Sequence, residues 1–159
     1  MKRTTWLILL VVALVGVAVT SAPTNAAGEQ ATVTAAARGA FGAGTALNSI
    51  SLQTFDLGTG VFIEPDGSAS GPINVVLYGR SVLGQAQQII IDGTADRGAV
   101  GPNGRAYFSG LATINLGSGK PLLTNVPFTV NAADNSLVLT VNSTALPIAG
   151  ITAGIVSVE

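Results

Sequence analysis

The chain contains neither cysteine nor histidine, and these two absences exclude several kinds of chemistry. Without a thiol it can form no disulfide and offers no thiolate nucleophile. Without an imidazole it can form no Ser-His or Cys-His pair, and no zinc site of the ordinary type is available. A catalytic or metal-binding role would therefore depend on carboxylates and hydroxyls alone.

Charged residues are scarce as well, at 9% of the 159 residues. Two of the seven basic residues, Lys2 and Arg3, precede Ala27, so five remain after it against eight acidic residues, a net charge of −3. No basic patch is visible in the sequence, and we therefore expect no nucleic-acid partner. Apolar residues make up 48% of the chain, which is unlike a disordered protein, so we expect it to fold.

The N-terminal segment predicts export from the cell. Lys2 and Arg3 precede a short apolar run, Trp6–Val19, and small or polar residues follow it around Pro23. A basic start, a short apolar run and small residues in this order are typical of a cleavable signal peptide. The run is shorter than the roughly 20 apolar residues that a transmembrane helix needs. An uncleaved N-terminal anchor is the alternative interpretation.

The small residues Thr24-Asn25-Ala26 predict cleavage after Ala26. Removing residues 1–26 from the 159 leaves 133 residues, which corresponds to a single domain over 27–159. A domain of that size buries roughly two thirds of its unfolded surface, so it can fold without disulfides. We expect this domain to be secreted, to the periplasm or the medium, with no membrane span after cleavage. Export without any disulfide favours a bacterial source.

The clearest secondary-structure signal lies in Gln85–Leu116, where the sequence predicts a β-hairpin. The arm Arg105–Leu116 alternates with a period of two, which predicts one face against a core and one polar face. Leu111 is the single apolar residue on the polar face. The turn formers Gly101-Pro102-Asn103-Gly104 separate the two arms. The predicted inward face consists of Ala106, Phe108, Gly110, Ala112, Ile114 and Leu116.

Similar short strands are predicted along the rest of the chain. A phase slip between Leu52 and Phe55 indicates a β-bulge, and Gly58-Thr59-Gly60 is predicted to be a turn. Pro72 is predicted to begin a strand, where its missing N–H is tolerated. Gln30–Phe41 is predicted to be either the first strand or a mobile arm. The other predicted strands are Ala46–Leu57, Val61–Ile63, Ile73–Gly79, Val126–Ala132, Leu137–Asn142 and Ile151–Val158.

About seven to nine short strands separated by turn signals predict a single all-β domain, either an antiparallel β-barrel or a β-sandwich. A barrel is favoured because it hides the edge strands of a chain with so few charges. In its glycine-punctuated strands the chain resembles many small exported bacterial β-proteins, although no motif indicates a particular family. The expected core includes Val75, Leu77, Phe108, Ile114, Phe128, Val130 and Leu139.

The carboxylates indicate neither catalysis nor metal binding. A glycosidase needs two facing carboxyl groups about 5–10 Å apart, whereas the six internal acidic residues lie in or beside predicted turns. Asp92 and Asp96 could share a calcium ion, but the ligand spacing of a calcium-binding loop is absent. We therefore predict no catalytic residue, no metal site and no cofactor. The six residues are Asp56, Glu64, Asp66, Asp92, Asp96 and Asp134.

Three residues on the polar strand faces are candidates for binding a ligand: Tyr78, Arg105 and Tyr107. Aromatic faces and guanidinium groups make good contacts with sugars and carboxylates, so they would form a ligand patch if their strands met. The alternative is an ordinary solvated sheet face.

The leading functional hypothesis is a non-catalytic exported β-domain with a structural or interaction role at the cell surface or in the medium. Its partner would be a surface protein or a polysaccharide. One alternative is a carrier that holds an apolar ligand in a barrel cavity. Another is an enzyme on a β-barrel scaffold that works with carboxylates alone.

Cleavage of the signal segment can be tested directly. Because the small residues before Ala27 fit the specificity of signal peptidases, N-terminal sequencing of the exported protein should begin Ala27-Gly28-Glu29. Recovery of membrane-bound protein that still begins at Met1 would contradict the prediction.

Overall fold

The computed structural model describes residues 29–117, 119–146 and 148–159, so the predicted signal segment and its cleavage point lie outside the described residues. Within these ranges the chain forms ten β-strands and one 3₁₀ turn, η1 (Pro102–Gly104). No helix among the described residues is long and apolar enough to span a membrane. The strands are β1 (Ala31–Phe41), β2 (Ala46–Leu47), β3 (Ile50–Ile63), β4 (Ser68–Arg80), β5 (Ala86–Gly101), β6 (Arg105–Asn115), β7 (Leu123–Ala133), β8 (Ser136–Val141), β9 (Thr144–Leu146) and β10 (Ile148–Val158).

All ten strands belong to one antiparallel sheet with the order β10-β1-β3-β4-β5-β6-β7-β8-β9, and β2 pairs separately with β3. From β3 to β9, strands that follow one another in the chain are neighbours in the sheet, whereas β10 returns to pair with β1. The predicted all-β antiparallel class is confirmed, although β3 and β5, with 14 and 16 residues, are longer than expected.

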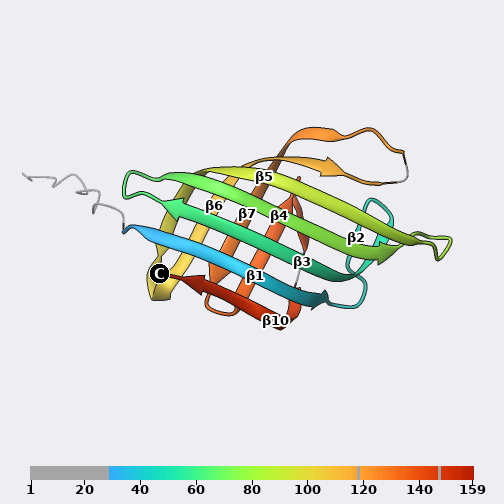
Figure 1. Cartoon of the computed structure of the whole chain (residues 1–159), viewed down its shortest axis with the longest axis horizontal. Coiled ribbons are helices and arrows are strands. Elements are labelled where there is room, and N and C mark those ends of the chain that lie inside the picture. The colour runs from blue at the N-terminus through green and yellow to red at the C-terminus, as the bar shows by residue number, and fades with distance from the viewer. Residues whose placement is uncertain (1–28, 118, 147) are drawn as a thin grey trace, which may run out of the picture.

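The sheet curls into a half-barrel. Figure 1 shows β10, β1, β3 and β4 side by side as one wall, with β6 and β7 crossing behind them as part of a second wall. Between the two walls, the turn that joins β7 to β8 reaches β10: the N–H of Asn135 donates to the carbonyl of Val156 at 3.0 Å, and the N–H of Val158 donates to Asp134 Oδ1 at 3.2 Å. Among the described residues no ladder joins β10 to β8, so these contacts hold the two walls together without closing the barrel.

Inward-facing side chains fill the space between the walls. The predicted alternation of β6 is confirmed, because its even-numbered residues from Ala106 to Ile114 are buried while Leu111 is 50% exposed. The rings of Phe108 and Phe128 meet edge to face with centroids 6.4 Å apart. An interior void beside Phe55 measures about 10 Å³, which is no more than a single water molecule needs. All seven expected core residues are buried: Val75, Leu77, Phe108, Ile114, Phe128, Val130 and Leu139.

Several local predictions are wrong. Ala46–Leu57 is not a single strand, because the chain turns at Asn48 and Ser49, both with positive φ, between β2 and β3. Gly58-Thr59-Gly60 is not a turn, because β3 continues through it and Gly58 pairs with Ala36 on one side and Asn74 on the other. Pairing with two neighbours outweighs the local turn preference of glycine. Pro72 does not begin a strand but lies inside β4, beside a register shift between Ser68 and Gly71 that interrupts the ladder to β5. Such an irregularity is where a sheet tolerates proline.

Register shifts bend the sheet at several points, and glycine faces the shift where the backbones crowd. The shift between Leu52 and Thr54 confirms the predicted bulge in β3. Another lies between Ala95 and Arg97 in β5, and its partner on β6 is Gly110. A Cβ atom at Gly110 would lie 2.0 Å from the carbonyl oxygen of Thr94, so only glycine fits there.

Replacing this glycine should therefore destabilise the fold. We expect Gly110→Ala to lower the free energy of unfolding by about 1–3 kcal/mol or more, as overpacking does. Gly58→Ala is the matched control, because a Cβ there meets nothing within 4 Å. That substitution should be neutral or stabilise by up to about 1 kcal/mol. Urea unfolding followed by circular dichroism measures both, and equal stability of the two variants would contradict the close approach.

Candidate binding site on the outer face

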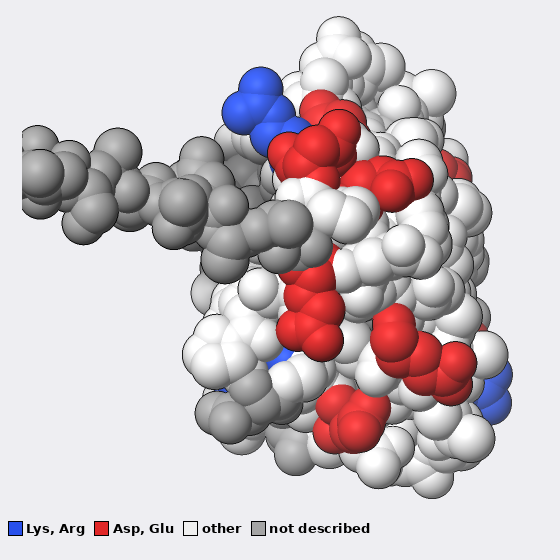
Figure 2. All heavy atoms as spheres, turned by 90° about the vertical axis from the view of Figure 1, so that its left-hand side faces the viewer, with Lys and Arg blue, Asp and Glu red and all other residues white. Residues whose placement is uncertain are grey.

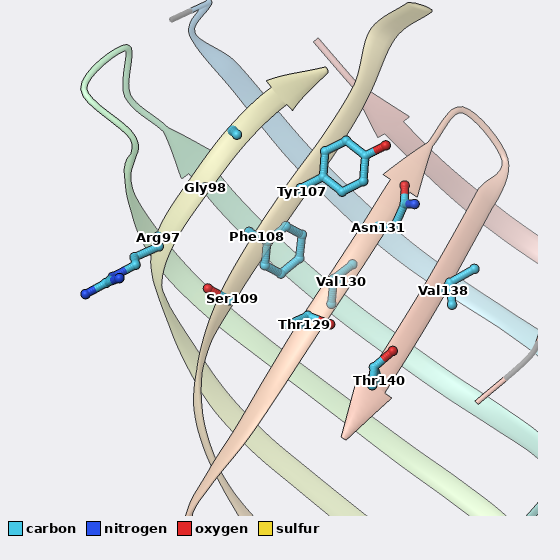
Figure 3. A pocket seen from close by; sticks show the side chains of 11 residues that line it. Arg97, Gly98, Tyr107, Phe108, Ser109, Thr129, Val130, Asn131, Val138 and Thr140 are labelled. Carbon is cyan, nitrogen blue, oxygen red and sulfur yellow. The ribbon is translucent and has the colours of Figure 1, made fainter. Parts of the chain in front are cut away.

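A groove of about 490 Å³ lies on the outer face of the sheet and spans β5, β6, β7 and β8 (Figure 3). Its volume falls within the range of about 300–1,000 Å³ that is usual for ligand sites. The groove is open to solvent. Its lining extends across four strands, so it is suited to an extended ligand.

Two cross-strand rows of side chains form the groove. Residues directly opposite one another in a sheet share a face and are close enough to contact a ligand together. The first row contains Ala99, Tyr107, Asn131 and Val138, in the order β5 to β8. The second row contains Arg97, Ser109, Thr129 and Thr140 in the same order.

The bulge in β5 determines which way Arg97 points. Ala95 faces the core, so an uninterrupted strand would also turn Arg97 inward. The extra residue, Asp96, reverses the alternation. Gly98 then faces inward, where a Cβ would lie 2.8 Å from Ile63, and Arg97 is exposed on the outer face.

The floor of the groove is rigid because it lies directly on the core. Phe108 and Val130 contribute to its lining but are themselves only 2% exposed, and their side chains lie beneath the strands that carry the two rows. Tyr107, by contrast, is 40% exposed. A ligand would therefore meet side chains that the packed sheet already holds in position.

The chemistry of the rows suits a ligand that carries hydroxyl or carboxylate groups. The groove presents the ring of Tyr107, the amide of Asn131 and the guanidinium of Arg97, together with the hydroxyls of Ser109, Thr129 and Thr140. Its lining contains neither Asp nor Glu. An aromatic face can pack on the apolar side of a sugar ring, amide and hydroxyl groups can bond its hydroxyls, and arginine can bind a carboxylate through two parallel hydrogen bonds.

The structure does not bring the three candidates Tyr78, Arg105 and Tyr107 together. Tyr107 lies in the groove, and Arg105 precedes it by two residues on the same exposed face of β6 without lining the groove. Tyr78 pairs with Gln88 of β5, whereas Tyr107 pairs with Ala99. At about 3.3 Å per residue, the 11 positions between those partners correspond to on the order of 35 Å.

Tyr78 instead belongs to a second polar cluster on the outer face of β1, β3 and β4, beside a hollow of about 320 Å³. Arg38 donates two hydrogen bonds to Asp56, from Nε to Oδ1 at 2.5 Å and from Nη2 to Oδ2 at 3.1 Å. The hydroxyl of Tyr78 donates to Asp56 Oδ2 at 3.0 Å. The carboxylate of Asp56 thus has two partners within the sheet, which makes it less available to a ligand.

The hydrogen bonds from Arg38 lower the pKa of Asp56, and the bond to Asp56 raises the pKa of Tyr78. Because the pKa of Asp56 is lower in the folded chain than in the unfolded one, the cluster stabilises the fold above the ordinary pKa of aspartate. That contribution is lost as the pH falls through the lowered folded value. The side chains of Arg38 and Asp56 are both solvent-accessible, so this contribution to stability is small.

Sequence reasoning missed Arg97 and Asn131. A signal for Arg97 was present, since Asp96-Arg97 places two charged residues in succession within an alternating strand, as a bulge does. Asn131 gave no signal of its own, because only the pairing of β7 with β6 sets it beside Tyr107.

Within the described ranges, no group of three or more Asp or Glu residues is arranged to hold a metal ion. Asp92, one of the two candidate calcium ligands, accepts a hydrogen bond from the amide of Asn74 on the outer face. Asp96 is the extra residue of the β5 bulge.

The chain matches no protein-family model, and searches of curated proteins and of solved structures gave no significant match. The geometry of the groove is therefore the basis for a functional proposal.

The Tyr78 cluster can be tested by titration. The chain has two tyrosines, so a Tyr107→Phe protein reports Tyr78 alone by ultraviolet absorbance. In that background we expect Asp56→Asn to lower the pKa of Tyr78 toward the ordinary value, because the carboxylate that raises it is removed. Asp92→Asn is the control and should leave the midpoint unchanged. A midpoint that Asp56→Asn does not move would show that the hydrogen bond is absent in solution.

Proposed function

We propose that this protein is an exported, non-catalytic β-domain that binds a polysaccharide along the groove on β5–β8. The observation that carries the proposal is the pair of cross-strand rows, which place the ring of Tyr107, the amide of Asn131 and the guanidinium of Arg97 on one rigid surface. An open groove on a sheet accommodates a chain whose two ends extend beyond the site. Export, with cleavage after Ala26, is part of the proposal and rests on the N-terminal sequence pattern.

The filled interior favours surface binding over an internal carrier role. The void beside Phe55 and Leu139 measures about 10 Å³, far below the size of an apolar ligand. The lining of the groove likewise favours binding over hydrolysis, because it lacks the two facing carboxyl groups that glycoside cleavage usually requires.

Affinity electrophoresis with soluble polysaccharides tests the proposal. A neutral β-glucan and an acidic uronic-acid polymer are suitable probes. We expect at least one of them to retard the protein, and Tyr107→Ala to weaken that binding about tenfold, since stacking and burial of an aromatic ring contribute on the order of 1 kcal/mol or more.

Tyr78→Ala is the matched control, because Tyr78 is similarly exposed, at 37% against 40%, but lies in the other cluster. Its affinity should equal that of the unmodified protein. Arg97→Ala should weaken binding of the acidic polymer more than that of the neutral one. The proposal would be refuted if neither polymer retarded the protein. It would also be refuted if Tyr78→Ala weakened binding as much as Tyr107→Ala does.

A further inference from the structure

The two ends of the half-barrel differ sharply in composition. In an antiparallel sheet the turns alternate between the ends, so one end gathers the β3–β4, β5–β6 and β7–β8 turns and the last residue of the chain. This acidic end carries the exposed carboxylates Glu64, Asp66, Asp134 and Glu159, with the exposed Arg105 beside the β5–β6 turn. Figure 2 shows acidic side chains gathered on that face of the molecule.

The opposite end, here called the apolar end, consists of residues 42–45, 48–49, 81–85, 116–117, 119–122 and 142–143. None of these residues is Asp or Glu. Lys120 belongs to this end and Arg80 adjoins it at the end of β4, so the little charge that it carries is positive.

The two most exposed large apolar side chains of the described residues lie at this end, whereas the next, Ile155 at 66%, lies on β10. Val82 and Leu83 are each 85% exposed in the β4–β5 turn, which extends beyond the rest of the sheet in Figure 1. Leu122 is 57% exposed in the β6–β7 connection, which lies at the same end. Aliphatic side chains this exposed on projecting turns are suited to leave water for an apolar environment.

Three backbone N–H groups of the β4–β5 turn are hydrogen-bonded within the turn. The N–H of Ser81 donates to the carbonyl of Gln85 at 2.9 Å, and the N–H of Gly84 donates to the carbonyl of Ser81 at 2.8 Å. The N–H of Gln85 reaches the hydroxyl of Ser81 at 3.2 Å, and Arg80 Nη1 donates to the carbonyl of Gly84 at 3.0 Å. The turn could therefore enter a lipid interface without leaving these groups unpaired, which would otherwise be costly.

We propose that the apolar end docks on the surface of an anionic lipid bilayer. Val82 and Leu83 insert into the interface between headgroups and acyl chains, and Leu122 contacts the same layer. Arg80 and Lys120 lie at the level of the lipid phosphates, where their charge is complementary. The acidic end is repelled and points away from the membrane. This inference is independent of the groove, whose residues lie on the outer face of β5–β8.

Site-specific tryptophan fluorescence on the full chain tests the docking. The single native tryptophan, Trp6, is first replaced by phenylalanine, and Leu83→Trp is then introduced. With vesicles of phosphatidylcholine and phosphatidylglycerol, we expect a blue shift and a loss of about half of the emission to brominated acyl chains, because the probe enters the interface. Leu122→Trp should respond in the same direction, and high salt should weaken both responses.

Leu111→Trp is the matched control, because Leu111 is an exposed leucine in the middle of β6, away from both ends. Its emission should be unaffected by the vesicles. The measurement reports the depth of each probe separately, so it remains decisive even if the N-terminal segment holds the chain on the lipid. Unchanged emission of the Leu83→Trp protein, or equal quenching of the Leu111→Trp protein, would overturn the proposal. A blue shift that follows protein concentration and not lipid would indicate association between copies, and would overturn it too.

Discussion

The curvature of the sheet depends on points where two backbones approach more closely than a side chain allows. A Cβ atom at Gly79 would lie 2.3 Å from the carbonyl oxygen of Ser51, and one at Gly154 would lie 1.9 Å from that of Ala36. Gly79 faces the register shift in β3, as Gly110 faces the one in β5. The glycines permit the bends, and the bends bring the two walls onto a common core.

The same bend creates the candidate site. The extra residue Asp96 bends β5 locally, and it also turns Arg97 outward to complete the second row. Fold and site therefore share one structural cause. The groove cannot be altered at this point without altering the curvature, whereas Tyr107, on a regular part of β6, can be changed without affecting the bend.

The sequence predicted best what local alternation determines. The hairpin of β5 and β6 and the buried face with Phe108 followed from a period of two and a strong turn. Gly58 was misread because a glycine in a long paired strand has the same local sequence as one in a turn, and only its partners Ala36 and Asn74 distinguish them. The two rows of the groove depend on register between strands, which no single strand encodes. Tyr107 was identified as a candidate for its residue type, but its cross-strand neighbours Ala99 and Asn131 could not be.

The pairing of β1 with β10 has a consequence for how the chain folds. Val33 pairs with Val158, and every other strand lies between them in the sequence. One edge of β1 therefore remains unsatisfied until the last strand has formed, while β3–β4 and β5–β6 can assemble early as local hairpins. Long-range pairing of this kind is slow, because a long loop must close before its contacts form. The edge of β1 that faces β10 is therefore among the last edges of the sheet to be covered.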